Sequence, residues 1–148
     1  MSRFVSCQNQ HSLLKRDIEA ELVPAMQARD LGLLPFFPLA GGLLTGKYRR
    51  DAPPPAGTRF ARAASRAERF LNAANWAVVE RLQDFCAQRG HTLLELAVSW
   101  LEARPYVASV IAGATKPEQV EQNVKAAGWA LTAQDLAEID KLSGFECS

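Results

Sequence analysis

Cysteine is scarce in this sequence, and neither sign of charge is in excess. The chain has 148 residues and only three cysteines, Cys7, Cys86 and Cys147, which lie far apart and match no metal-ligand or redox spacing. We therefore expect reduced thiols and no metal site. Seventeen basic residues against sixteen acidic ones give a net charge of +1, so no positive field is available to hold a nucleic acid or an anionic membrane.

Long apolar runs and a leader segment are also missing. The first residues contain no basic region followed by an apolar stretch, and no segment reaches the roughly 18 apolar residues that a membrane span needs. We expect a cytoplasmic protein with neither a nucleic-acid nor a membrane partner. The remaining composition, 48% hydrophobic and 22% charged, is typical of one globular domain with a real core.

Three short apolar runs, over residues 4–7, 31–39 and 107–112, predict strands. Each is apolar without clean alternation, as parallel strands buried on both faces tend to be. Apolar spacing of three to four residues or capping signals predict helices over residues 15–29, 75–89, 92–104, 115–127 and 133–142. The alternation of strands and helices predicts an α/β fold with right-handed crossovers.

The helix signals differ in kind. Thr92 and Thr115 each precede a glutamate by three residues, which is the capping-box form, and Thr132 is expected to cap the last helix. Pro24 lies inside the first helical pattern and argues against an unbroken helix there.

Residues 41–61 interrupt the alternation. They contain four glycines and three consecutive prolines and predict a long irregular loop after the second strand. A loop of this length is usually functional or disordered, and it can also separate two domains; we favour a functional loop because no shift in composition follows it.

Three strand-and-helix units cannot close a parallel barrel, which takes roughly 250 residues. An open sheet of three strands would leave two edges with unpaired backbone groups. The first predicted strand also starts close to the beginning of the chain. We therefore expect the chain to be a piece of a larger fold.

Two motifs resemble segments of the aldo-keto reductases. Residues 34–48, LPFFPLAGGLLTGKY, resemble the family's strand seven and its loop, and residues 111–123, IAGATKPEQVEQN, resemble strand eight and the helix after it. Residues 5–14, VSCQNQHSLL, are similar to strand six and its exit loop. The resemblance implies that residues 1–148 form the C-terminal part, strands six to eight, of a (β/α)8 barrel of the TIM type that binds NADP(H) and reduces aldehydes and ketones.

The resemblance also implies which residues bind the cofactor. Gln8 matches the residue that hydrogen-bonds the nicotinamide carboxamide, Phe36 matches the aromatic residue that stacks on the nicotinamide ring, and the 41–61 loop would cover the pyrophosphate. The other matching positions are Leu39, Gly41, Lys47 and Arg59 for the pyrophosphate, and Gly113, Thr115, Gln119, Gln122 and Asn123 for the adenosine and its 2′-phosphate. A helix N-terminus beside Thr115 and Lys116 suits an anion and predicts a preference for NADPH over NADH.

Three positions depart from the family pattern. Phe36 stands where tyrosine is frequent, Phe37 where serine is frequent, and His11 where tyrosine is common. By composition alone Phe37 is expected in the core, and His11 is expected to be a surface or loop-packing residue.

The family's catalytic residues have no counterpart in this chain. Carbonyl reduction needs a proton donor at the developing alkoxide, and the family uses Tyr with Asp, Lys and His on earlier strands. One hypothesis is a reductase segment that works only when an N-terminal half completes the barrel around a small aldehyde or ketone. The alternative is a non-catalytic NADP-binding or self-associating remnant of a truncated gene, or a product without function.

Overall fold

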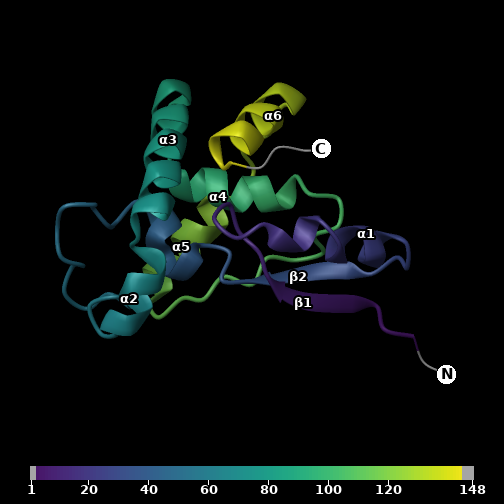
Figure 1. Ribbon diagram of the computed structural model, residues 1–148, viewed down its shortest axis with the longest axis horizontal. Coiled ribbons are helices and arrows are strands. Elements are labelled where there is room, and N and C mark those ends of the chain that lie inside the picture. Colours follow the sequence, from purple (N-terminus) through teal and green to yellow (C-terminus); the bar gives the residue numbers. More distant parts are fainter. Residues whose placement is uncertain (1–2, 145–148) are drawn as a thin grey trace.

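Two of the three predicted strands are regular in the computed structural model, which describes residues 3–144. β1 (Ser6–Gln10) and β2 (Gly32–Phe36) pair in parallel, with Gln8 opposite Leu34 (Figure 1). The predicted α/β content and the parallel pairing of the first two strands are confirmed.

The prediction that the first strand begins at residue 4 is wrong. Phe4 and Val5 precede β1, and their side chains are 85% and 76% exposed. A strand buried on both faces was expected there, but nothing in residues 3–144 covers these two side chains.

The third predicted strand, over residues 107–112, is not a regular strand. The Leu33 amide donates to the Tyr106 carbonyl at 2.7 Å, and the Ala108 amide donates to the Leu33 carbonyl at 2.9 Å. The chain thus runs parallel to β2 along the edge that β1 leaves free, but forms only an isolated bridge there. Gly32 permits this approach, because a Cβ at that position would lie 2.7 Å from the Ala108 Cβ.

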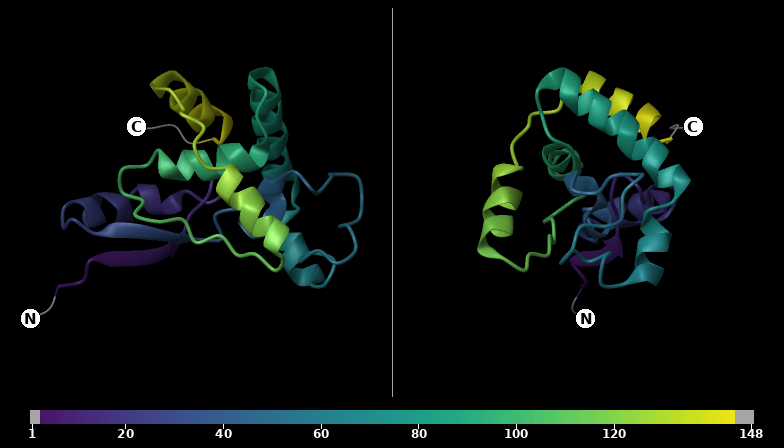
Figure 2. Two further views of the ribbon diagram at one scale, coloured as in Figure 1. Left: turned by 180° about the vertical axis from the view of Figure 1, so that it is seen from behind. Right: turned by 90° about the vertical axis from the view of Figure 1, so that its left-hand side faces the viewer.

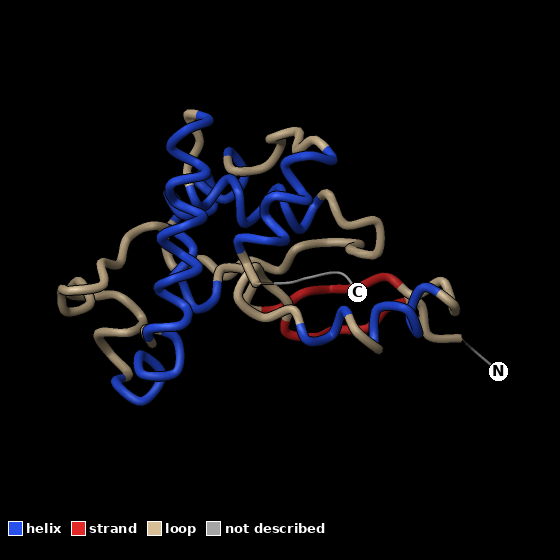
Figure 3. The backbone as a smooth tube through the Cα atoms, turned by 45° about the horizontal axis from the view of Figure 1, so that its top comes forward, coloured by secondary structure: helices blue, strands red, loops and turns tan. Residues whose placement is uncertain are grey.

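Helices make up most of the remaining chain, as the coiled ribbons of Figure 1 and the blue segments of Figure 3 show. They are η1 (Asp17–Glu19), α1 (Leu22–Gln27), η2 (Ala40–Thr45), α2 (Ala64–Phe70), α3 (Ala73–Arg89), α4 (Leu93–Glu102), α5 (Pro117–Lys125) and α6 (Ala133–Leu142), where η denotes a 3-10 helix. None of the helices in the described part of the chain is both long and apolar enough to cross a bilayer.

The predicted helix over residues 15–29 is wrong as a single helix. It is divided into η1 and the short α1. Pro24 has no N–H to donate to the carbonyl of Ala20, so a helix cannot run through this point, whereas the first turn of α1 accepts the proline.

Two of the last three helices, α4 and α6, follow their sequence signals closely. At α4, the Glu95 amide donates to the Thr92 hydroxyl while the Thr92 amide donates to the Glu95 carboxylate. Thr132 and Asp135 form the same reciprocal pair at α6. These capping boxes satisfy amide groups that a helix start would otherwise leave free, which explains why both helices begin where predicted.

The 41–61 segment is only partly the irregular loop that its composition predicted. It begins within η2, which is kinked at Gly41 and Gly42, where φ is 70° and 102°. Four of its apolar residues are buried in the core, namely Leu43, Leu44, Tyr48 and Phe60. The prediction of irregular structure is therefore wrong for residues 43–45 but holds at the kink, and the loop is anchored to the core near both of its ends.

The two faces of the small sheet differ in burial. Leu33 and Pro35 are buried on the face that packs toward the helices, whereas Leu34 and Phe36, on the opposite face, are half-buried. The core on the helical side is centred on Trp100 of α4, which is completely buried. One face of the sheet is thus left partly open.

Cys7 and Cys86 are free thiols, and burial raises the pKa of the Cys86 thiol to about 12. Cys147 lies outside the described residues.

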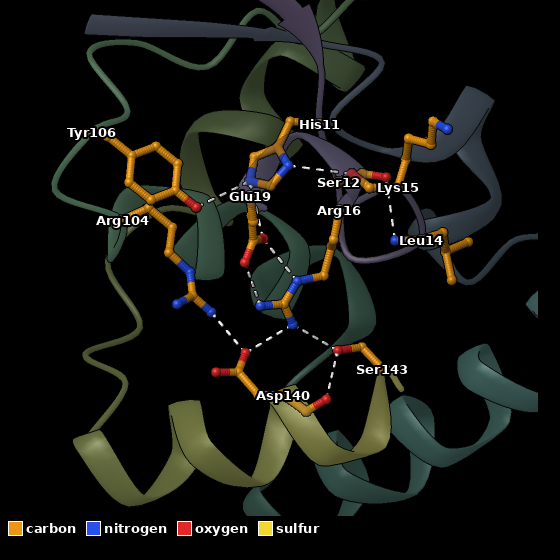
Figure 4. Close-up of polar contacts among 10 residues, drawn as sticks. All are labelled: His11, Ser12, Leu14, Lys15, Arg16, Glu19, Arg104, Tyr106, Asp140 and Ser143. Atoms are coloured by element: carbon orange, nitrogen blue, oxygen red, sulfur yellow. Dashed lines mark hydrogen bonds and ion pairs between the residues drawn. The ribbon is translucent and has the colours of Figure 1, made fainter. Parts of the chain in front are cut away.

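A buried ion network joins the exit loop of β1 to α6 (Figure 4). The Arg16 guanidinium donates to both carboxylate oxygens of Glu19 and to the Asp140 carboxylate, in each case at 2.8 Å. It also donates to the Ser143 hydroxyl at 2.8 Å and lies 4.9 Å above the Trp100 ring. Arg16 itself is only 7% exposed.

His11 lies within the same network and is completely buried, so the surface position is wrong and the loop-packing alternative holds. Its Nδ1 is 3.2 Å from the Lys15 carbonyl oxygen, and its Nε2 is 3.4 Å from the Tyr106 hydroxyl and 3.6 Å from the Glu19 carboxylate (Figure 4). Burial lowers the pKa of His11 below its ordinary value, and this effect outweighs the nearby Glu19 charge, which raises the pKa.

Arg16→Ala should lower the free energy of unfolding by about 3–5 kcal/mol, because it leaves the Glu19 and Asp140 carboxylates without their shared cation. Urea denaturation provides the measurement. Arg50→Ala is the matched control, because the exposed Arg50–Glu80 pair contributes at most about 1 kcal/mol. Equal losses in the two variants would contradict the importance of the buried network.

His11 should make the protein less stable as the pH falls from 7 toward 5. The folded-state pKa lies below the ordinary value of 6.5, so between these two values the unfolded chain binds the additional proton and is favoured. His11→Asn should reduce the slope of unfolding free energy against pH in this range. The same substitution at His91, which stacks on Trp129, serves as the control, and an unchanged slope in His11→Asn would refute this assignment.

Candidate functional site

The segments that follow the strands meet at one end of the molecule. Figure 2 (right) shows this end, with α5 on one side of the strand ends and α2 on the other. Ligands of open parallel sheets bind outside the carboxyl ends of the strands. The predicted site residues all belong to β1, to β2 or to the segments that follow β2 and residues 106–111.

Gln8 and Phe36 lie on the same face of the sheet. Gln8 is opposite Leu34, which is two residues before Phe36, and side chains two residues apart on a strand share a face. Gln8 is exposed and Phe36 is half-buried, so the amide and the ring are both open to a ligand on this face.

The turn after β2 gathers Leu39, Gly41 and Lys47. The Gly42 amide donates to the Leu39 carbonyl at 2.8 Å, and a Cβ on Gly42 would lie 3.0 Å from the Lys47 Nζ. The lysine thus folds back over the turn, and within residues 3–144 its ammonium group has no ion-pair partner. Gly41 has a φ of 70°, and a Cβ there would lie 2.8 Å from Phe60.

Arg59 is exposed and lies on the aromatic ring that follows Phe36. Its guanidinium carbon is 5.7 Å from the centre of the Phe37 ring. Phe37, which composition placed in the core, is half-buried. Arg59 is therefore close to the end of β2.

The segment before α5 holds two donors directed at one point. The Thr115 amide and hydroxyl both donate to the Gln119 side-chain oxygen, at 2.7 Å and 3.2 Å. The predicted capping role of Thr115 is wrong, because the N-cap is Lys116, and α5 ends at Lys125, two residues before the predicted end. No side chain of the N-cap residue bonds to the first turn of α5, so the positive end of the helix dipole faces the same region.

The other residues of this segment are less constrained. Gly113 and Gln122 are exposed, and Asn123 is half-buried at the edge of a cavity of about 560 Å³ between residues 107–114, α4 and α5. Most of its lining is apolar, and Val120 and Val124 of α5 are 53% and 69% exposed. The apolar side of α5 is therefore only partly covered by the rest of the described chain.

The site thus consists of three groups of residues at one end of the strands. Gln8 and Phe36 share a sheet face, the turn holds the second group, and Thr115 and Gln119 form the third. In the part that the structure describes, no hydrogen bond joins the third group to the other two. Nor does this part hold a group of three or more His, Cys, Asp or Glu residues that could bind a metal ion.

The sequence did not predict α2, whose last residue, Phe70, packs against aromatic residues near this site. Phe70 at the end of α2 stacks on Phe60 at 5.5 Å and lies 6.4 Å from Phe37. No capping side chain marks the start of α2, so the sequence carried no strong signal for the helix.

Comparison with known proteins gives a consistent result. The model of the Aldo/keto reductase family matches residues 1–143. A probable voltage-gated potassium channel subunit beta of Arabidopsis thaliana is 36% identical over 119 residues, which cover 76% of this chain and 34% of that protein. The L-glyceraldehyde 3-phosphate reductase of Escherichia coli (strain K12) is 34% identical over 140 residues, which cover 90% and 40%.

The uncharacterized oxidoreductase YrpG of Bacillus subtilis (strain 168) is 33% identical over 133 residues, which cover 90% of this chain and 38% of that protein. The chain therefore spans about a third to two fifths of the length of these relatives.

Gly41→Ala should destabilise the protein more than Gly57→Ala. Both glycines have positive φ, so each substitution costs about 1–2 kcal/mol in backbone energy, but nothing lies within 4 Å of a Cβ on Gly57. The methyl group on residue 41 would meet Phe60 and should cost a further 1–3 kcal/mol or so, as overpacking does. Equal losses in urea denaturation would show that the turn does not pack on Phe60.

Proposed function

This chain belongs to the aldo/keto reductase family, and on that premise we propose that it forms the part of an NADP(H)-dependent carbonyl reductase that carries strands six to eight and most of the cofactor loops. The complete enzyme would reduce a small aldehyde or ketone by hydride transfer. Two of the relatives have names that denote a reductase or an oxidoreductase, which supports redox chemistry. A cytoplasmic location, and the absence of nucleic-acid and membrane partners, stay predictions of the sequence.

The observation that carries the proposal is the convergence of the Thr115 amide and hydroxyl on one acceptor oxygen, that of Gln119, beside the start of α5. An acceptor oxygen of a phosphate would take the place of the amide oxygen there once the Gln119 side chain turns away. The positive end of the α5 dipole favours the same exchange. These residues therefore fit the 2′-phosphate of NADP(H).

The other two groups fit the remaining parts of the cofactor. Lys47, which has no ion-pair partner in residues 3–144, would neutralise the pyrophosphate; a cation about 4 Å from a phosphate is worth on the order of 4 kcal/mol at an effective dielectric of 20, before desolvation is subtracted. Phe36 would stack on the nicotinamide, and Gln8 would hydrogen-bond its carboxamide. The bound nicotinamide supplies the hydride.

A proton donor has to come from outside this chain. Tyr48 is buried in the core, and burial raises the pKa of Tyr106 to about 12 in the network around His11. Neither tyrosine lies where the family places its donor. We propose that an N-terminal half, as the rest of a longer polypeptide or as a separate chain, supplies strands one to five and the catalytic Asp, Tyr, Lys and His.

The open surfaces of the chain support a completing partner. Within residues 3–144, β1 pairs only with β2, so its other edge carries unpaired backbone groups next to the exposed Phe4 and Val5. The same edge favours the self-associating form of the second candidate, a non-catalytic remnant that binds NADP or associates with itself. Light scattering of the purified chain distinguishes the two candidates, because a self-associating remnant would be a dimer or larger.

NADPH should bind the purified chain saturably and more tightly than NADH, as followed by energy transfer from tryptophan to the nicotinamide. Thr115→Val should weaken NADPH binding by about tenfold or more, the effect of one lost hydrogen bond to a charged group, and leave NADH binding unchanged. Thr132→Val is the matched control, because it removes the cap of α6 without touching the strand ends. Equal affinity of the folded protein for NADPH and NADH would contradict the proposed 2′-phosphate site.

A further inference from the structure

Phe37 has a backbone conformation that is rare for its residue type. Its φ is 53°, in the left-handed region that favours glycine. An aromatic residue remains in this region only where the surrounding contacts hold it there, and such residues often lie at ligand sites. The conformation is therefore a reason to ask what the Phe37 side chain contacts.

The Phe37 ring contacts Phe36 at the end of β2 on one side and the segment of residues 46–70 on the other. Its centre is 5.6 Å from the Phe36 ring, in an edge-to-face arrangement. The Phe70 ring of α2 is 6.4 Å away, and the Arg59 guanidinium lies 5.7 Å above the ring. Phe37 thus contacts the proposed nicotinamide-stacking residue and two separate parts of the segment between residues 46 and 70.

The contacts continue into the core. Phe70 stacks on Phe60 at 5.5 Å with an angle of 27° between the ring planes, and Phe60 lies 4.8 Å from the Tyr48 ring. Phe60 and Tyr48 are almost completely buried. The far end of the aromatic row is therefore fixed, whereas its near end, at Phe37, is half-exposed.

Residues 49–59, between the buried Tyr48 and Phe60, make few other contacts near the ends of the strands. Residues 49–59 are mostly exposed, and Arg59 forms no ion pair within residues 3–144. Its guanidinium instead lies in a cation–π contact with the Phe37 ring.

We propose that Phe37 is a positioning residue, whose ring holds Arg59 and α2 beside Phe36 and so keeps the 46–63 segment closed over the end of β2. Its consequence for binding rests on the proposed function: with the ring in place, the segment opens rarely and NADP(H) leaves slowly. The geometric part, that the ring holds the segment closed, does not depend on the cofactor.

The test compares Phe37→Leu, which removes the ring, with Phe37→Tyr, which keeps it. Trypsin cleavage after Arg59 and Arg62 in the cofactor-free chain reports how often the segment opens. Phe37→Leu should be cut about fivefold to tenfold faster at a similar melting temperature, and Phe37→Tyr at the wild-type rate. Phe4→Leu, at the exposed phenylalanine before β1, is the control and should be cut at the wild-type rate.

Stopped-flow displacement of NADPH then measures release. Dissociation should be several-fold faster from Phe37→Leu and unchanged in Phe37→Tyr. If neither the wild type nor any variant binds NADPH, the proposed function fails and the trypsin comparison still decides the geometric part.

Equal cleavage of Phe37→Leu and the wild type would overturn the proposal. So would faster cleavage that Phe37→Tyr fails to restore. Should Phe37→Leu not fold, Phe70→Leu breaks the same contact from the α2 side; faster cleavage after Arg59 then supports the proposal, and an unchanged rate overturns it.

Discussion

The buried guanidinium of Arg16 is the interaction on which the arrangement of this chain depends. It donates to Glu19 at the end of η1 and to Asp140, which lies 124 residues later in α6, while its flat face packs against Trp100 in α4. A buried cation is tolerated only when opposite charges and acceptors surround it. The need to neutralise the buried Arg16 charge therefore holds together the exit loop of β1, α4 and α6.

The Arg16 network leaves the carboxyl ends of β1 and β2 free to form a ligand-binding site. Leu33 and Pro35 face the core side, so Gln8 and Phe36 are left on the open face. The turn after β2 is fixed from below by Phe60 against Gly41, while the Lys47 ammonium remains at its surface. The chain thus combines a packed core with two cations, Lys47 and Arg59, that form no ion pair within residues 3–144.

Local signals predicted the parts of the fold that local physics controls. The capping boxes at Thr92 and Thr132 fixed the starts of α4 and α6, and Gly90 in the left-handed conformation ends α3. Signals that depend on distant partners failed. Residues 107–112 have a strand-like composition but are paired on one side only. The capping signal at Thr115 failed for a local reason, because the cap lies one residue later, at Lys116, and the Thr115 donors bond to the Gln119 side chain.

The sequence by itself determined the family, the parallel order of the first two strands and the identity of the residues at their ends, because motifs and apolar periodicity are local properties of the chain. Only the tertiary structure decided that His11 is buried against Glu19 and Tyr106, that the 41–61 segment enters the core through Tyr48 and Phe60, and that Phe37 joins Phe36 to α2. The contacts of His11 with Tyr106 and of Phe37 with Phe70 join residues far apart in the chain, and the energy of such contacts arises from burial and charge neutralisation that exist only once the segments have packed.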